Sequence, residues 1–283
     1  TAITVATDAK SIFQQIESEY GEIQALGLLG RAHAAMGDLV ASREALEQCL
    51  AKAEAGVVVQ LRTFARLVHA GAAVQLGDPV AALAHLNKVE ARPDGRRVIG
   101  SVDLEVTAAL ATLQQGDAVA ALRALESVDS EDAEVRWYLD SVLALAHCSV
   151  GNVEEAATHA TRVLGASRAT YLDRRTASLA LALSYARRGE RVEMEQAFSD
   201  ALAAVDATES RLSQALARLA RAVAYEVIGD SQADAYHLEA GSLLADIGVE
   251  PDGWEDAFRV AVGDKFNPVG LHNAGGSPDK PSW

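Results

Sequence analysis

Apolar residues along this chain recur three and four positions apart, with polar residues between them, in runs that end at a glycine. Leu26, Leu29, Ala32 and Met36 show this spacing before Gly37. A second run with the same spacing follows each such glycine. The spacing is typical of amphipathic α-helices, and the lack of strict alternation argues against strands. We therefore predict pairs of helices joined by tight turns.

A glycine followed by an acidic residue or an asparagine returns six times. The pairs are Gly37-Asp38, Gly77-Asp78, Gly116-Asp117, Gly151-Asn152, Gly189-Glu190 and Gly229-Asp230, at intervals of 40, 39, 35, 38 and 40 residues. Glycine can end one helix in the left-handed conformation, and the next side chain can cap the following helix. A period in this range predicts a stacked array of helical hairpins.

Small and aromatic residues recur at matching places in these units. In unit one they are Leu29-Gly30, His33, Gly37-Asp38, Ser42, Leu46 and Leu50. In units five and six they are Leu181-Ala182, Tyr185, Gly189-Glu190, Met194, Phe198, Ala222, Tyr225, Gly229-Asp230, Ala233 and Ala240. The pattern over residues 20–247 resembles the tetratricopeptide repeat. It departs from that family in a period longer than about 34 residues and in an aromatic position often held by His, Ala or Thr.

The resemblance implies an all-α fold, a right-handed α-α superhelix of about six helical hairpins. We expect a partial leading repeat helix in residues 1–20, six hairpins in 21–249, a closing helix in 250–263 and an irregular tail in 264–283. The longer units look like the sensor arms of bacterial multidomain regulators, including signal-transduction ATPases and large nucleotide cyclases.

The two ends carry their own predictions. Residues 8–19 are expected to form the second helix of a unit whose first helix is missing, with an apolar face made by Ile12, Phe13 and Ile16. Since the chain begins without a methionine, we expect it to be part of a longer polypeptide. In the closing helix the side chains expected to turn inward are Trp254, Ala257, Phe258 and Val262.

Charge and composition exclude some classes of protein. The net charge of −15 argues against direct nucleic-acid binding, which needs clustered Lys and Arg. No uncharged apolar run approaches the length of a membrane span, and no signal peptide opens the sequence. Cys49 and Cys148 lie in apolar helical phases, where we expect reduced core thiols. These features favour a cytoplasmic protein.

The sequence shows no pattern typical of catalysis or of cofactor binding. It has no phosphate-binding loop, no dinucleotide fingerprint and no metal-ligand spacing. His147 and Cys148 are adjacent, but neighbours on a helix point about 100° apart and cannot easily share a metal. We therefore expect no enzyme activity, no metal and no cofactor.

In the repeat family the first helices line a concave groove. Carried over by register, the groove positions are Gln24, Arg31, Phe64, Gln75, Asp103, Gln114, Tyr138, Ser141, Thr176, Arg187 and Glu226. Tyr138 and Phe64 could anchor an apolar side chain, and the arginines could hold a carboxylate. The alternative is that so polar a lining is solvated surface. Because no asparagine lies on a first helix, a chaperone-type carboxylate clamp is disfavoured.

A local excess of arginine follows unit four. The residues of this candidate basic patch are Arg168, Arg174, Arg175, Arg188 and Arg191, with Arg187 nearby. One interpretation is a site for an anion or an acidic partner. The other is a set of exposed ion pairs between helices, each contributing roughly 0–1 kcal/mol.

These observations lead to two functional hypotheses. The first is a non-catalytic arm of a larger bacterial signalling or transcriptional regulator, which binds a protein, a peptide or a small effector. Its partner could be an upstream domain of the same polypeptide. The second is a free-standing adaptor that brings proteins together, and an enzyme or a peptide-pheromone receptor ranks third. A sensor should change shape on binding its ligand, whereas an adaptor should not.

Overall fold

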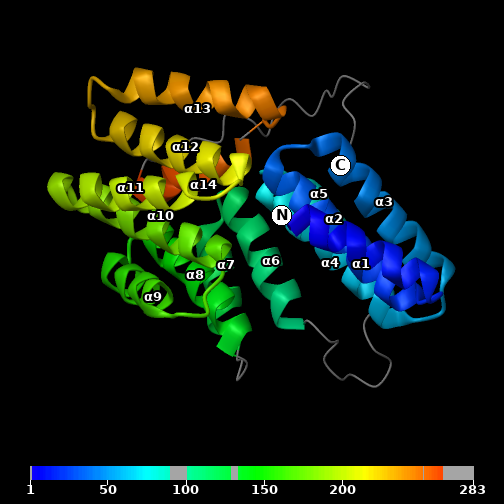
Figure 1. The fold of residues 1–283 in the computed structure, drawn as a ribbon. Coiled ribbons are helices and arrows are strands. Elements are labelled where there is room, and N and C mark those ends of the chain that lie inside the picture. The colour runs from blue at the N-terminus through cyan, green and yellow to red at the C-terminus, as the bar shows by residue number, and fades with distance from the viewer. Residues whose placement is uncertain (1, 90–100, 129–132, 251, 264–283) are drawn as a thin grey trace, which may run out of the picture.

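The protein is built from α-helices packed in two layers (Figure 1). The computed structural model describes residues 2–89, 101–128, 133–250 and 252–263, and within these ranges it contains fourteen helices and no strand. The predicted all-α fold class is confirmed. The right-handed sense of a superhelix stays a prediction.

Twelve of these helices form six antiparallel pairs. The first helices are α2 (Glu19–Met36), α4 (Val59–Gln75), α6 (Ser101–Gln114), α8 (Ala133–Val150), α10 (Tyr171–Arg188) and α12 (Arg211–Val227). The second helices are α3 (Leu39–Ala55), α5 (Pro79–Leu86), α7 (Ala118–Glu126), α9 (Val153–Gly165), α11 (Arg191–Asp206) and α13 (Ala233–Ile247). Helix α1 (Ala2–Gln15) precedes the pairs and α14 (Asp252–Val262) follows them.

The repeated glycines adopt the left-handed backbone conformation that the sequence pattern predicts. Their φ angles run from +72° at Gly189 to +93° at Gly151. The side chains of Asp38, Asp78 and Asp117 each accept a hydrogen bond from the backbone N–H three residues later, at 3.1, 2.9 and 2.9 Å. Asn152 and Glu190 begin their helices without a side-chain cap. The turn chemistry is therefore shared, while capping is complete in only half of the units.

The hairpins stack so that the first helices form an inner layer. Each first helix packs against the next, from α2 through α12. The row curves until its ends meet, because α2 also packs against α12 and the Ser210 hydroxyl donates to the Ala35 carbonyl at 3.2 Å. Ile247 of α13 lies against Gly37 at the end of α2. The array thus closes on itself, a feature that the repeat period did not predict.

Helix α14 fills part of the ring. It packs against the inner helices α6, α8, α10 and α12, and the inward orientation predicted for Trp254, Ala257, Phe258 and Val262 is confirmed by their burial. The Trp254 indole Nε1–H donates to the Gln75 carbonyl at the end of α4 at 2.9 Å. The concave surface of hairpins three to six is therefore occupied by the chain itself.

The leading helix differs from its prediction. It spans Ala2–Gln15 rather than residues 8–19, and Ser18 begins the next helix by accepting a hydrogen bond from the Gly21 N–H at 3.3 Å. Phe13 packs against Gly21, but Ile12 and Ile16 are 55% and 64% exposed. The prediction of one buried face was wrong for these two isoleucines, because the helix ends before Ile16 and turns Ile12 outward.

Other predictions have simple outcomes. Cys49 and Cys148 are free thiols in the core, and burial raises their pKa values to about 12 and about 11. None of the described helices combines the length and the apolar composition that a membrane span requires. The predicted irregular tail, residues 264–283, lies outside the described residues.

Candidate functional site

A hollow lies where the two ends of the array meet. It has a volume of about 410 Å³ and lies among α1, α2, α4, α10 and the start of α12. Its apolar wall comprises Ala2, Ile3, Leu28, Ala32, Ala34, Ala35, Met36, Gly71, Ala72, Leu172 and Leu212. Its polar groups belong to Arg31, Gln75, Tyr171, Arg175, Thr208, Glu209, Ser210 and Ser213. We call this space the joint cavity.

The joint cavity exists because small residues of the first two hairpins face it. A Cβ atom added to Gly71 in the middle of α4 would meet no atom within 4 Å. Ala32 and Ala35 on α2 likewise leave room that larger side chains would fill. Cavities of roughly 300–1,000 Å³ with a mainly apolar lining and a few polar groups are typical of small-molecule sites.

Arg175 is the most unusual side chain in this lining. It is only 4% exposed, and its guanidinium donates to Gln75 Oε1 at 2.9 Å and to Ser213 Oγ at 3.2 Å. Its Cζ lies 5.6 Å from the centre of the Trp254 ring, within cation–π range. Burial lowers its pKa to about 10, so the group still carries its charge near neutral pH.

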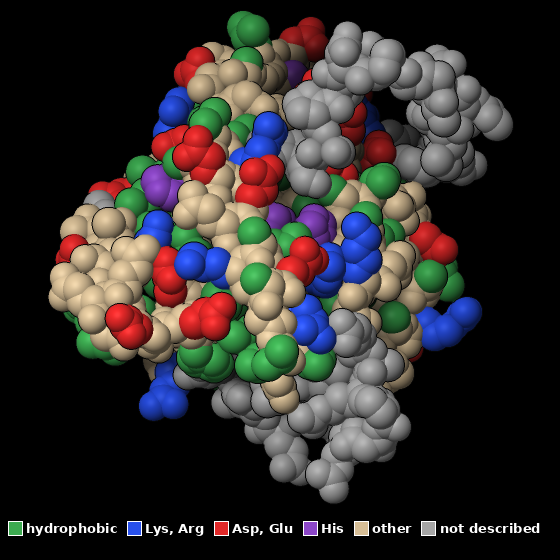
Figure 2. All heavy atoms as spheres, turned by 90° about the vertical axis from the view of Figure 1, so that its right-hand side faces the viewer, with side chains coloured by type: hydrophobic (Ala, Val, Ile, Leu, Met, Phe, Trp, Pro, Cys, Tyr) green, Lys and Arg blue, Asp and Glu red, His purple; other side chains and the backbone are tan. Residues whose placement is uncertain are grey.

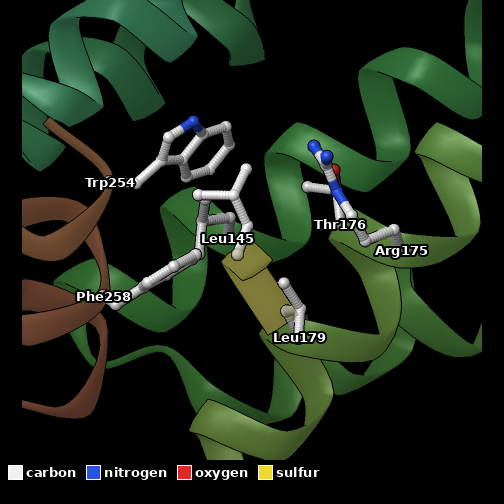
Figure 3. Close-up of a pocket in the computed structure, with 7 residues that line it drawn as sticks. Leu145, Arg175, Thr176, Leu179, Trp254 and Phe258 are labelled. Carbon is white, nitrogen blue, oxygen red and sulfur yellow. The ribbon is translucent and has the colours of Figure 1, made fainter. Parts of the chain in front are cut away.

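The surroundings of Arg175 on the α14 side are tightly packed. Figure 3 shows the side chain beside Thr176 and Leu179 of α10, with Trp254 and Phe258 approaching from α14. The space between these groups leaves no room for a water molecule. Solvent or a ligand therefore cannot reach the guanidinium through this space, whereas Arg175 also lines the joint cavity.

No carboxylate within the described ranges lies at ion-pair distance from Arg175. Its hydrogen bonds go to a neutral amide and a neutral hydroxyl. Asp173, a carboxylate that acts on Arg175 electrostatically, accepts instead from the Thr170 N–H at 2.9 Å and hydroxyl at 2.8 Å. Burial raises the pKa of Asp173. A buried cation without a direct anionic partner is costly, which makes this position a candidate anion site.

Three of the sequence-predicted residues meet in the joint cavity. Arg31 and Gln75, predicted as groove residues, line it together with Arg175, predicted as part of the basic patch. Arg31 is exposed at the cavity and Gln75 is half-buried. Ring closure brings these residues together, since they come from the first, second and fifth hairpins.

Several other predicted groove residues serve the interior of the protein. Gln114 is 1% exposed and donates to the Val74 carbonyl at 2.8 Å. Ser141 and Thr176 are buried and bond to carbonyls of their own helices. Tyr138 shares a hydrogen bond of 3.3 Å with Thr107. Gln114, Ser141 and Thr176 are thus corrected from groove residues to packing residues, because the helices around them close over their side chains.

The remaining groove residues also have internal contacts. Phe64 of α4 packs against Gly27 of α2, and Gln24 donates to the Tyr20 hydroxyl at 3.1 Å. Glu226 accepts from Arg259 of α14 at 2.8 Å. Asp103 is half-buried.

Arg187 holds two helix ends together rather than a partner. Its guanidinium donates to the carbonyls of Cys148 and Ser149 at the end of α8, at 2.9 and 3.2 Å. It also donates to the carbonyls of Val260 and Ala261 in α14, both at 3.2 Å. The prediction that it lines a free groove is corrected, because α14 occupies that place.

The candidate basic patch does not form one surface. Arg174 donates to the carbonyls of Leu164, Ala166 and Ala169. Arg188 pairs with Glu154 and Glu190, and Arg191 pairs with Glu195 and Asp230. Arg168 is exposed. The interpretation as ion pairs and helix contacts therefore fits Arg174, Arg188 and Arg191, whereas Arg175 turns inward.

The outer surface carries mixed charge on the face that Figure 2 shows. Acidic, basic and apolar side chains are interspersed there over α1, α3, α4 and α5. A field of one sign, which would attract a strongly charged polymer, is absent from that face. The joint cavity is thus a more specific feature than this outer face.

Sequence reasoning missed several residues of the joint cavity. Tyr171 begins α10, Glu209 precedes α12, Ser213 lies in the first turn of α12 and Met36 ends α2. The repeat register therefore gives them no groove position. Their proximity depends on closure of the ring. A hint was present in the small residues at Ala32, Ala35 and Gly71, which leave an inner layer underfilled.

Comparison with known proteins adds no family assignment. No protein-family model matches this chain, and no curated protein matches it in sequence.

Proposed function

We propose that this protein is a non-catalytic, effector-binding arm of tetratricopeptide type, with the joint cavity as its ligand site. The observation that carries the proposal is the buried, unneutralised Arg175 at the wall of a cavity of about 410 Å³. A packing defect would not be expected to hold a charged group at its wall, whereas a binding site commonly does.

The proposed mechanism follows from where the walls come from. Helices α2 and α4 belong to the first two hairpins, and α10 and α12 belong to the last two. A ligand in the joint cavity would contact both ends of the array and stabilise their closed arrangement. Because the ligand would bind the closed form more tightly, it would shift the conformational equilibrium of the array toward that form. Attached domains could sense this change in curvature.

The wider setting is part of the same proposal. We place the arm within a bacterial, cytoplasmic signalling or transcriptional regulator, where a change of curvature would alter contacts with another domain or protein. Two reduced core thiols support the cytoplasmic part of this setting.

A matched pair of variants tests the site. Gly71→Phe fills the joint cavity, whereas Gly241→Phe makes the same change on the exposed side of α13, where an added Cβ also meets no atom within 4 Å. A small-molecule fragment library would be screened by ligand-observed NMR against both variants and the wild-type protein. We expect fragments that bind the wild type and Gly241→Phe but not Gly71→Phe.

Small-angle scattering then separates the two functional hypotheses. A bound fragment should make the wild-type protein more compact if the arm is a sensor. Fragments that bind equally to all three proteins would remove the joint cavity as the site. A protein partner that binds tightly without change of shape would favour the free-standing adaptor.

A further inference from the structure

We propose that the joint cavity binds a small organic acid, with one carboxylate against Arg175 and Arg31 and an apolar body along the wall of α1, α2 and α12. This inference rests on the proposed function and names the chemical class of its ligand. It uses the charge, the wall and the size of the site together.

The positive charge selects an anion. Arg175 already donates hydrogen bonds to Gln75 and Ser213, and these bonds to neutral groups fix the plane of the guanidinium. A guanidinium has five N–H donors, so further donors remain for a ligand. A carboxylate matches the forked geometry of arginine and can accept two parallel hydrogen bonds. An amine ligand would place two cations together in a poorly solvated site.

The acidic groups around the joint cavity disfavour a dianion. Arg31 and Arg175 contribute two positive charges to the lining and Glu209 one negative charge, and the carboxylate of Asp173 nearby acts on both arginines. Arg31 is exposed, and among the described residues it has no ion-pair partner. A dianion such as phosphate would leave uncompensated negative charge near Glu209, whereas a carboxylate would be neutralised.

The wall selects an apolar body. Ile3, Leu28 and Leu212 supply branched side chains, and Met36 supplies a flexible thioether that adapts to different shapes. Alanines and Gly71 leave space between them. Burying the ligand's apolar surface here would supply the larger part of its affinity, while the carboxylate would fix its orientation.

The size selects a small molecule over a polymer. A cavity of about 410 Å³ lies near the lower end of the range for small ligands. It could enclose a short fatty acid or an aromatic acid. The apolar C-terminus of a peptide has the same carboxylate chemistry, so the test includes it as a separate arm.

The test compares ligands that differ only in their head group. Octanoate, octan-1-ol and octylamine are titrated into the wild-type protein by isothermal calorimetry near neutral pH. An acetylated Leu-Leu dipeptide with a free C-terminus represents the peptide source. We expect octanoate to bind at least about 10-fold more tightly than the alcohol, and neither the amine nor the dipeptide to bind measurably.

Variants of the two arginines locate the head group. Arg175→Gln should weaken octanoate binding by about 30-fold or more, and Arg31→Gln by about 3- to 10-fold, because Arg31 is more exposed to solvent. Neither change should alter the affinity for octan-1-ol. Arg168→Gln, on the exposed surface outside the joint cavity, is the matched control and should leave octanoate binding unchanged.

Arg31→Gln keeps the test decisive if Arg175→Gln does not fold, since Arg31 is exposed and makes no hydrogen bond or ion pair that holds helices together within the described ranges. Equal affinity for octanoate and octan-1-ol, unchanged by Arg31→Gln, would overturn the acid inference. Tighter binding of the dipeptide than of octanoate would also overturn it.

The experiments distinguish a wrong class of ligand from a cavity that is not a ligand site. If the alcohol or the amine binds better than the acid, and Gly71→Phe abolishes this binding, the joint cavity remains a ligand site with another chemistry. If no ligand distinguishes Gly71→Phe from Gly241→Phe, both the inference and the proposed function fail.

Discussion

The inner surface of this array has two different regions, one covered by a helix of the chain and one that remains hollow. Over α6, α8, α10 and α12 it is covered by α14, whose Trp254 and Phe258 are almost fully buried. Over α2 and α4, beside the joint with α10 and α12, the same layer carries small residues and remains hollow. One repeat architecture thus supplies both a packing surface and a cavity, and the difference lies in side-chain size and in the presence of a helix that fills the space.

Truncating Trp254, which anchors α14 to the inner helices, should cause the largest loss in the free energy of unfolding. Trp254 is 2% exposed and also donates to the Gln75 carbonyl. Trp254→Ala should lower the free energy of unfolding by about 3–5 kcal/mol, because it leaves a large cavity and an unsatisfied carbonyl. Urea denaturation followed by circular dichroism measures this loss. Trp254→Phe is the control and should lose less, and a loss below about 1 kcal/mol for the alanine variant would contradict the role of α14.

Arg187 should have the next largest effect, because it fastens α14 to α8. Arg187→Met removes the hydrogen bonds to carbonyls of both helices while keeping the length of the side chain. We expect a loss of about 2 kcal/mol in the free energy of unfolding, as for hydrogen bonds to a charged donor. Arg188→Met removes solvent-exposed ion pairs and a cation–π contact with Tyr185, and should cost about 0–1 kcal/mol. Equal effects of the two variants would remove Arg187 as a fastening residue.

His85 of α5, in the second hairpin, should make the stability of the protein depend on pH. Its ring stacks on His69 at 4.5 Å between centroids, and burial, then the nearby His69, Arg66 and Lys88, lowers its pKa from 6.5 to about 4. The folded protein therefore resists protonation that the unfolded chain accepts, so stability should fall as the pH drops from about 6.5 to about 4.

The expected size of this effect is roughly 1–2 kcal/mol, after allowing for the partial exposure of the ring. Since carboxylates also titrate in this range, the measurement is the difference between the wild-type protein and His85→Gln in denaturation curves at several pH values. The variant should have the flatter pH profile. Parallel profiles would mean that His85 is not held in its neutral form.

The smallest expected change in the free energy of unfolding is at Gly71, in the wall of the joint cavity. Gly71→Ala adds a methyl group to α4 without a clash and removes the flexibility of glycine. It should raise the free energy of unfolding by about 0.5–1 kcal/mol, as should Gly241→Ala on the surface of α13. Thermal denaturation of the two variants checks this. A destabilised Gly71→Ala beside a stabilised Gly241→Ala would show that α4 has no free space at Gly71.

The sequence pattern could predict the hairpins but not the contact between the first and the last of them. The Gly-Asp steps act within a few residues, so their period predicts helix, turn and helix at each unit. Trp254 and Phe258 could be placed on an inward face by spacing alone. The pairing of Ser210 with Ala35, however, joins residues 175 positions apart, and no local pattern reports it.

The same limit explains the groove residues. Register places Gln114 and Arg187 on first helices, but it does not show that neighbouring carbonyls would use them. Adjacent residues on a helix point in different directions, so Arg174 turns to the loop after α9 while Arg175 turns into the ring. Total curvature decides which of these side chains reach the joint cavity, and curvature sums many small angles between hairpins.

The most direct test of the account uses the two methionines of the chain. Met36 lines the joint cavity, whereas Met194 is fully buried in α11 away from it. With both methyl groups labelled with carbon-13, NMR spectra are recorded while octanoate is added. The account predicts a saturable shift of the Met36 signal with little change at Met194. A Met36 signal that stays in place, or one that moves only together with Met194, would contradict a ligand site at the joint.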